Sequence, residues 1–175
     1  MNKKNKINYS ITNTDIENYL MSPNIAKYGD ISNMDGIDEL FNGNCYVIIL
    51  VESEENSGHW CLCLRYDDDI IEQFDSYGGK IDNETKYISS DKKLQLNEEN
   101  NELANILQGY KVVVSKYRFQ KLSSDVDTCG KWTLLRILMF ILGHMEIDEF
   151  TTWFKKLAKE ERCSNDELVC RLITF

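Results

Sequence analysis

A cysteine stands where a polar loop gives way to an apolar segment, in Thr128-Cys129-Gly130. At the N-terminus of a helix, unpaired backbone N–H groups and the positive end of the helix dipole favour a thiolate over a thiol. The following glycine lets another backbone approach closely. Cys129 is therefore a candidate nucleophile for acyl transfer. By itself, a Cys-Gly pair more often marks a cysteine that only begins a core helix.

A nucleophilic cysteine needs a base within hydrogen-bond reach, and histidine is the usual one. The chain has two histidines, His59 and His144. His144 follows Gly143 at the end of the helix predicted to begin near Cys129. At 1.5 Å per residue it lies roughly 22 Å from Cys129, and its position is typical of a C-terminal helix charge. If Cys129 has a histidine partner, that partner is His59, which begins a predicted strand.

Asp75 ends the predicted strand that follows the strand of His59. If the turn at 67–69 joins these two strands antiparallel, the start of the first lies beside the end of the second. His59 and Asp75 would then fall at the same end of the sheet, where a carboxylate orients an imidazole and stabilises its charged form. The alternative is a turn aspartate, which is common before Ser and Gly.

Acyl transfer also needs hydrogen-bond donors aimed at the developing oxyanion. The backbone N–H of Cys129 supplies one, and the side-chain amide of Gln120, upstream of the cysteine, can supply another. The alternative is a surface glutamine in a polar loop.

The periodicity of apolar residues predicts the elements that position these side chains. A continuous β-branched run predicts a strand buried on both faces, and two further runs complete an antiparallel meander. Helices dominate the second half, and the polar stretch 88–101 is expected to be a loop. We expect an α+β fold with a central mixed or antiparallel sheet packed against helices, in a single domain spanning residues 1–175. The predicted strands are 45–51, 59–66, 70–75 and 112–117. A short first helix is predicted to begin near residues 12–15 and to end before Pro23. The other predicted helices are 35–41, 101–108, 130–142, 148–159 and 165–173.

Composition excludes several classes of protein. The net charge of −9 argues against broad nucleic-acid binding. Three of the first six residues are lysines, which indicates a frayed terminus or, alternatively, a basic arm. The apolar run 132–142 contains Arg136 and is too short to cross a membrane. Without a secretory signal, we expect a cytosol-like compartment.

The chain has six cysteines. Their spacing matches no zinc site, so we expect no metal and no cofactor. Without a secretory signal they are not expected to form a disulfide framework, because the chain is large enough to fold without one. Cys61 and Cys63 alternate with leucines and are expected to share one face of a sheet.

The candidate residues occur in the order His59-Trp60, Asp75-Ser-Tyr-Gly78, Gln120, Cys129-Gly130. This order, with tryptophan directly after the histidine, resembles the adenain and Ulp1 group of cysteine peptidases. The resemblance runs from about residue 45 to residue 142. Within the group, the chain is most similar to the maturation proteases of Sputnik-type virophages and large DNA viruses, because it is short and rich in Asn, Lys and Ile.

The resemblance implies a papain-like fold of the Ulp1 and adenain type. It also implies His59 as base, Asp75 as orienting acid, Gln120 as oxyanion donor and Cys129 as nucleophile. Trp60 would roof a narrow channel that admits glycine-rich substrate residues, and Gly130 would border the substrate. One feature departs from the group: the glutamine lies nine residues before the cysteine (129 − 120), further than in better-known members. Ser123 and Ser124 stand at the usual distance and are alternative donors.

The implied function is an endopeptidase that cleaves viral capsid or core precursors at glycine-containing sites during virion maturation, in the virion or in the host cytoplasm. A second hypothesis keeps the chemistry and changes the substrate to conjugates of ubiquitin-like proteins, which end in Gly-Gly. A third is an inactive relative that serves as a binding protein. On each hypothesis the partner is a protein, while membranes and nucleic acid are not expected partners and the oligomeric state is open.

Overall fold

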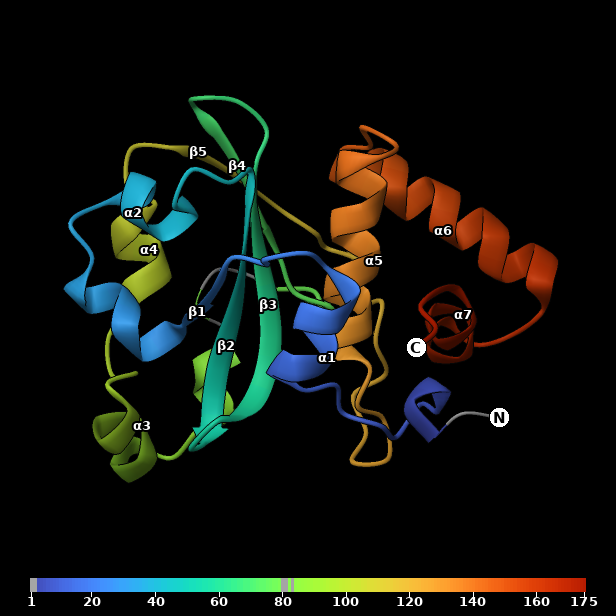
Figure 1. Ribbon diagram of the computed structural model, residues 1–175, viewed down its shortest axis with the longest axis horizontal. Helices are drawn as coiled ribbons and strands as arrows, with labels where there is room; N and C mark the ends of the chain where they lie inside the picture. The colour runs from blue at the N-terminus through green and yellow to red at the C-terminus, as the bar shows by residue number, and fades with distance from the viewer. Residues whose placement is uncertain (1–2, 80–81, 83) are drawn as a thin grey trace. The chain divides into compact units, whose positions relative to one another are not determined.

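The computed structural model describes residues 3–79, 82 and 84–175 (Figure 1). The chain folds into two compact units. The first unit is made of residues 1–23, 75–78 and 115–175, and the second of residues 24–74 and 79–114. The second unit holds the whole β-sheet, and the first holds the helices of the C-terminal third. That the whole chain forms a single domain stays a prediction.

The sheet of the second unit has five strands in the order β1-β2-β3-β4-β5. Strands β2 (Tyr46–Glu54), β3 (Ser57–Arg65) and β4 (Ile70–Phe74) form the predicted antiparallel meander. The two edge strands, β1 (Ile25–Lys27) and β5 (Lys111–Val114), run parallel to their neighbours. The sheet is therefore mixed, and the expected α+β class is confirmed.

One face of the sheet carries the core of the second unit. The helices α2 (Ile37–Phe41) and α4 (Glu102–Ile106) lie on one side of the sheet (Figure 1). Together with the 3₁₀ helix η2 (Tyr28–Asn33), they contribute apolar side chains to this core. Cys61 and Cys63 belong to the same cluster, which confirms that they share a face. The strand residues of the cluster are Val47, Ile49, Val51, Cys61, Cys63 and Ile71.

Two elements of the second unit differ from the sequence-based expectations. The stretch expected to be a loop contains helix α3 (Ser90–Leu96). None of its residues is buried, so it lacks the apolar stripe by which a helix is recognised. Strand β1 was also missed, because three residues are too few for a period to show. A further 3₁₀ turn, η3 (Glu84–Tyr87), precedes α3.

The first unit is helical. It contains η1 (Lys3–Asn5), α1 (Asn13–Tyr19), α5 (Cys129–Ile141), α6 (Ile147–Glu161) and α7 (Asn165–Leu172). Thr12 and Asp15 form a capping box that begins α1, and Ser164 and Glu167 form another that begins α7.

The core of the first unit is aromatic. The rings of Phe119, Trp132, Phe150 and Phe154 pack together with centroid separations from 4.7 to 6.3 Å. Trp132 lies in α5 and the last two lie in α6, whereas Phe119 belongs to the polar loop that precedes α5. The loop is therefore anchored one residue before Gln120 by a buried ring.

The expected frayed N-terminus is wrong for the residues that the structure describes. Lys3–Asn5 forms a 3₁₀ turn, and the Lys4 ammonium is paired with the buried carboxylate of Asp15. Asn5 Oδ1 accepts a hydrogen bond from the backbone N–H of Phe175 at 3.1 Å. Met1 and Asn2 lie outside the described residues.

Candidate functional site

Cys129 is the first residue of α5, as predicted. Its side chain is buried, with 6 % of the residue exposed. The first backbone N–H to bond back along the helix is that of Trp132, which donates to the Thr128 carbonyl at 3.0 Å. The N–H groups of Cys129, Gly130 and Lys131 therefore precede the hydrogen-bond ladder of α5. This is the arrangement expected of a nucleophile beside its own backbone oxyanion donors.

Asp75 begins a tight turn directly after β4. Its Oδ1 accepts a hydrogen bond from the Tyr77 backbone N–H at 2.9 Å, and its carbonyl accepts one from the Gly78 N–H at 2.9 Å. The turn-aspartate alternative is thus present in the structure, and it occupies one of the two carboxylate oxygens. Asp75 is buried, with 4 % exposed.

The turn 75–78 is docked on the loop that leads to Cys129. The backbone N–H groups of Phe119 and Gln120 both donate to the Ser76 carbonyl at 2.9 Å. Gly78 has φ +68, and a Cβ there would lie 2.8 Å from the Tyr117 carbonyl oxygen. A side chain at position 78 would therefore push the turn away from the loop.

Gln120 is almost completely buried, with 1 % exposed. Its Oε1 accepts a hydrogen bond from Ser76 Oγ at 2.7 Å, and its Nε2 donates to the Val126 carbonyl at 3.1 Å and to the Tyr77 hydroxyl at 3.3 Å. The surface-glutamine alternative is wrong. The amide is fixed in orientation, and its longest and weakest bond is the one to Tyr77.

Tyr77 lies in the electrostatic field of the candidate residues. Burial, and then electrostatic interactions with Cys129, Asp75, Asp127 and Asp166, raise the pKa of Tyr77 to about 12. Its phenol is therefore neutral at physiological pH and able to accept the Gln120 amide hydrogen. The first unit thus brings Asp75, Gln120 and Cys129 into one compact body around Tyr77.

His59 and Trp60 lie in the second unit, inside β3 rather than at its first residue. His59 pairs with Val51 of β2, and Trp60 pairs with Leu50. Alternation along the strand places His59 on the face of Cys61 and Trp60 on the opposite face. Trp60 is buried, with 3 % exposed, and His59 is half-buried.

The strand register behind the inferred proximity of His59 and Asp75 is as expected. β3 and β4 pair antiparallel, with Leu62 opposite Phe74, the residue before Asp75. His59 is three residues before Leu62 on β3. The approach of His59 to Cys129 stays a prediction.

His144 lies outside any such arrangement. It is exposed, follows the end of α5, and has φ +50. Its backbone N–H donates to the Phe140 carbonyl at 3.0 Å, so His144 closes the turn that follows the C-terminus of α5. This is the C-terminal position expected from the sequence.

Three contributors to the site were not assigned a role from the sequence. Ser76 and Tyr77 belong to the quoted motif Asp75-Ser-Tyr-Gly78, and their proximity to that aspartate was the available signal. Asp166 carried no signal, because an acidic residue in the first turn of a helix is common. The two serines named as alternative oxyanion donors are less buried than Gln120: Ser124 is exposed and Ser123 is half-buried.

All six cysteines are free thiols. Burial raises the pKa of the Cys170 thiol, which lies on α7. Cys45 is exposed. These two provide internal references for the reactivity of Cys129. The expectation that no metal or cofactor is used stays a prediction.

Comparison with curated proteins finds a relative in Sputnik virophage that bears the name Uncharacterized protein V9. The two sequences are 34 % identical over 152 residues, which cover 86 % of this chain and 82 % of the relative. No protein-family model matches the chain, and no solved structure matches it. Among the helices of the described residues, none has the length and hydropathy needed to cross a membrane. The similarity to the relative spans most of both chains rather than a single motif.

Proposed function

Because this chain belongs to the family of protein V9 of Sputnik virophage, we propose that it is a virophage cysteine endopeptidase that matures virion proteins. The virophage origin follows from the relative, while the activity is inferred from the residues. We assign it a papain-like fold of the Ulp1 and adenain type, with capsid or core precursors as substrates, cut at glycine-containing sites. The enzyme would act in the virion or in the host cytoplasm where virions assemble.

The observation that carries the proposal is that Gln120 and Cys129 are both buried in the same unit. A buried, oriented amide and a cysteine at the N-terminus of a buried helix are the two parts that acyl transfer needs for its oxyanion and its nucleophile. The bonds from Ser76 and to Val126 fix the amide. The long bond to Tyr77 is the one that an oxyanion would replace.

The proposed reaction has two half-reactions. His59 takes the proton of the Cys129 thiol, and the thiolate attacks the scissile carbonyl carbon. The negative oxygen of the tetrahedral intermediate is held by the Cys129 N–H and the Gln120 amide. The C–N bond then breaks, and the leaving amine takes the proton from His59, which leaves a thioester on Cys129.

Water completes the cycle. His59 removes a proton from a water molecule, which attacks the thioester carbonyl. The C–S bond breaks, the acid product leaves, and the proton returns to the thiolate of Cys129. Asp75 orients the imidazole through the carboxylate oxygen that the turn does not use. Trp60 and Gly130 line the channel for the residues around the scissile bond.

The test is cleavage of virophage capsid precursor by the purified chain. Cys129→Ala is expected to abolish cleavage, because the nucleophile is lost. Cys170→Ala is the matched control: it removes another buried cysteine of the same unit and is expected to retain cleavage. Identical fragments from wild type and Cys129→Ala would overturn the proposal.

A second pair of variants tests the base. His59→Ala is expected to abolish cleavage and to slow alkylation of Cys129 by iodoacetamide near neutral pH. His144→Ala, which removes the other histidine of the chain, is expected to change neither. Equal rates in the two variants would remove His59 from the mechanism.

A further inference from the structure

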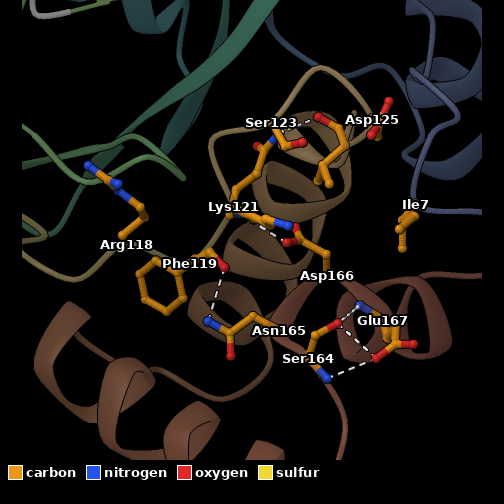
Figure 2. Close-up of a pocket in the computed structure, with 12 residues that line it drawn as sticks. Ile7, Arg118, Phe119, Lys121, Ser123, Asp125, Ser164, Asn165, Asp166 and Glu167 are labelled. Carbon is orange, nitrogen blue, oxygen red and sulfur yellow. Dashed lines mark hydrogen bonds between the residues drawn. The ribbon is translucent and has the colours of Figure 1, made fainter.

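Asp166 joins the two sides of the proposed oxyanion site. Its Oδ2 accepts a hydrogen bond from the Lys121 backbone N–H at 3.0 Å, one residue after Gln120 (Figure 2). Its Oδ1 accepts one from the Thr128 hydroxyl, one residue before Cys129, and a longer one of 3.4 Å from the Trp132 indole N–H. One carboxylate therefore ties the loop of the amide donor to the helix of the nucleophile.

The carboxylate is buried inside this unit, with 5 % of the residue exposed. Both Asp166 and Gln120 border a hollow of about 530 Å³. A buried charge is retained only where hydrogen bonds compensate its lost hydration. Here the compensating donors all come from the two segments that carry the proposed site.

Capping of its own helix does not account for Asp166. Helix α7 is begun by Ser164, whose hydroxyl accepts a hydrogen bond from the Glu167 backbone N–H at 3.2 Å. The Glu167 carboxylate in turn accepts a hydrogen bond from the Ser164 backbone N–H at 2.9 Å, which completes a capping box. Asp166 is turned away from that box, toward Lys121.

The bond to Thr128 has a consequence for α5. Thr128 is the N-cap of α5, and a threonine there ordinarily accepts a hydrogen bond from the second or third helical N–H, with extended backbone. Instead, Thr128 has φ −105 and ψ 1, and its side chain makes no capping bond. This is the sparsely populated bridge region of backbone conformation. The hydroxyl donates to Asp166, and in this backbone conformation the Thr128 side chain does not cap the first N–H groups of α5.

We propose that Asp166 is a positioning residue: it holds Thr128 in a non-capping conformation, so that the N-terminus of α5 stays open to the oxyanion while Gln120 is held opposite. The inference rests on the proposed peptidase function. Without Asp166, Thr128 is free to relax to the extended conformation and cap its own helix. The change in ψ of Thr128 rotates the peptide plane that carries the Cys129 N–H, so this donor turns away from the substrate oxygen and Cys129 is displaced.

The test compares Asp166→Ala, Thr128→Val and the double variant. Asp166→Ala is expected to lower kcat by about tenfold to a hundredfold, with a smaller change in KM, because a misplaced donor is felt mainly in the transition state. In the double variant no hydroxyl remains to cap α5, so kcat is expected to recover above that of Asp166→Ala. A support that only stabilises the fold would give a double variant at least as impaired as the single one, and that result overturns the proposal.

Glu167→Gln is the matched control. It alters the neighbouring acid in the same helical turn and weakens the capping box of α7, because the hydrogen bonds of Glu167 are to Ser164. It is expected to keep kcat within about twofold of wild type. A loss equal to that of Asp166→Ala would overturn the proposal. If Asp166→Ala does not fold, Asp166→Asn takes its place, since it preserves the volume and one acceptor oxygen.

Alkylation of Cys129 by iodoacetamide distinguishes failure of the positioning role of Asp166 from failure of the proposed peptidase function. It requires no peptide substrate, so it reports on the surroundings of the cysteine even if the wild-type chain cleaves nothing and the proposed function falls. A changed alkylation rate in Asp166→Ala, absent in Glu167→Gln, supports the positioning role. An unchanged rate overturns it, whatever the outcome with precursor.

Discussion

Ser76 donates a hydrogen bond of 2.7 Å to the side-chain oxygen of Gln120, so the turn after β4 sets the orientation of an amide 44 residues further along the chain. With the oxygen held by Ser76, the nitrogen of the amide is directed to Val126 and Tyr77. The orientation of Gln120 is thus a property of the turn that also contains Asp75.

Replacement of Ser76 by alanine is expected to lower kcat while KM changes little. A buried hydrogen bond of this kind contributes about 1 kcal/mol, which corresponds to roughly a fivefold loss of rate if it orients the donor. The measurement is steady-state cleavage of a glycine-containing peptide. Ser124→Ala, at an exposed serine of the loop that contains Gln120, serves as control. Equal kcat for the two variants would show that the Ser76 bond does not orient a catalytic group.

Gly78→Ala is expected to destabilise the chain more than Gly43→Ala. Both glycines have positive φ, +68 and +74, so both substitutions incur the same backbone strain of about 1 to 2 kcal/mol. Only at position 78 would the new Cβ collide with backbone, 2.8 Å from the Tyr117 carbonyl, whereas nothing lies within 4 Å at position 43. The difference in free energy of unfolding, measured in urea, isolates the docking of the turn on the loop. An equal loss of unfolding free energy in the two variants would mean that the turn 75–78 moves away from the loop without a measurable cost.

Glu98 makes the second unit less stable as pH rises toward neutrality. It is fully buried; its Oε1 accepts the Glu52 backbone N–H at 2.8 Å, and among the described residues Oε2 has no hydrogen-bond partner. Burial, with a smaller contribution from the Glu52 carboxylate, raises the pKa of Glu98 from 4.5 to about 7. The folded state therefore binds the proton more tightly than the unfolded state, and stability falls as pH rises from about 4.5 to 7.

Glu98→Gln is expected to remove this fall. At pH 5 the free energies of unfolding of the variant and of wild type should be nearly equal. At pH 8 the free energy of unfolding of the variant should exceed that of wild type by about 2 to 3 kcal/mol. The measurement is urea unfolding at the two pH values. Glu99→Gln, at the exposed neighbour, is the control. A pH dependence that is the same in both variants would contradict the prediction.

Asp15 gives the first unit the opposite pH dependence. Burial acts to raise the pKa of Asp15, but hydrogen bonds from Lys4, Thr12 and Tyr9 outweigh burial and lower it from 3.8 to about 2. A depressed folded-state pKa gives stability that is complete above the unfolded value and is lost as pH falls from about 4 to about 2.

Asp15→Asn is therefore expected to be less stable than wild type at pH 6 by about 1 to 2 kcal/mol and nearly equal to it at pH 2. The measurement is the thermal midpoint across that range. Asp148→Asn, in the first turn of α6, is a suitable control because its helix is begun by a different pair, Glu146 and Glu149. A constant difference between Asp15→Asn and wild type would contradict the linkage.

The sequence was sufficient to predict elements with a strong apolar period. The meander follows from continuous apolar runs separated by polar turns, and α5 follows from an apolar helix whose start at Cys129 was predicted within one residue. The short helix predicted over 35–41 is also present as α2, which ends at a left-handed Asn42.

The failures have physical causes. Strand β1 exists only because β2 offers it a parallel edge 23 residues later, a long-range pairing with no local period. Helix α3 buries none of its residues, so its sequence lacks an apolar stripe. Asp166 was overlooked for a similar reason: it lies 37 residues after Cys129, and only the folded unit brings its carboxylate to Thr128.

The buried ammonium of Lys131, two residues after Cys129, donates to the carbonyls of Lys6 and Tyr9, at 3.3 and 3.0 Å. These bonds join two segments of the first unit that are more than 120 residues apart, and the whole sequence of the second unit lies between them in the chain. During translation, the N-terminal segment must therefore wait until the ribosome has released α5 before it acquires its partner. All residues of the second unit precede α5 in the chain, so they are synthesised first, and the surroundings of the proposed nucleophile are expected to assemble last.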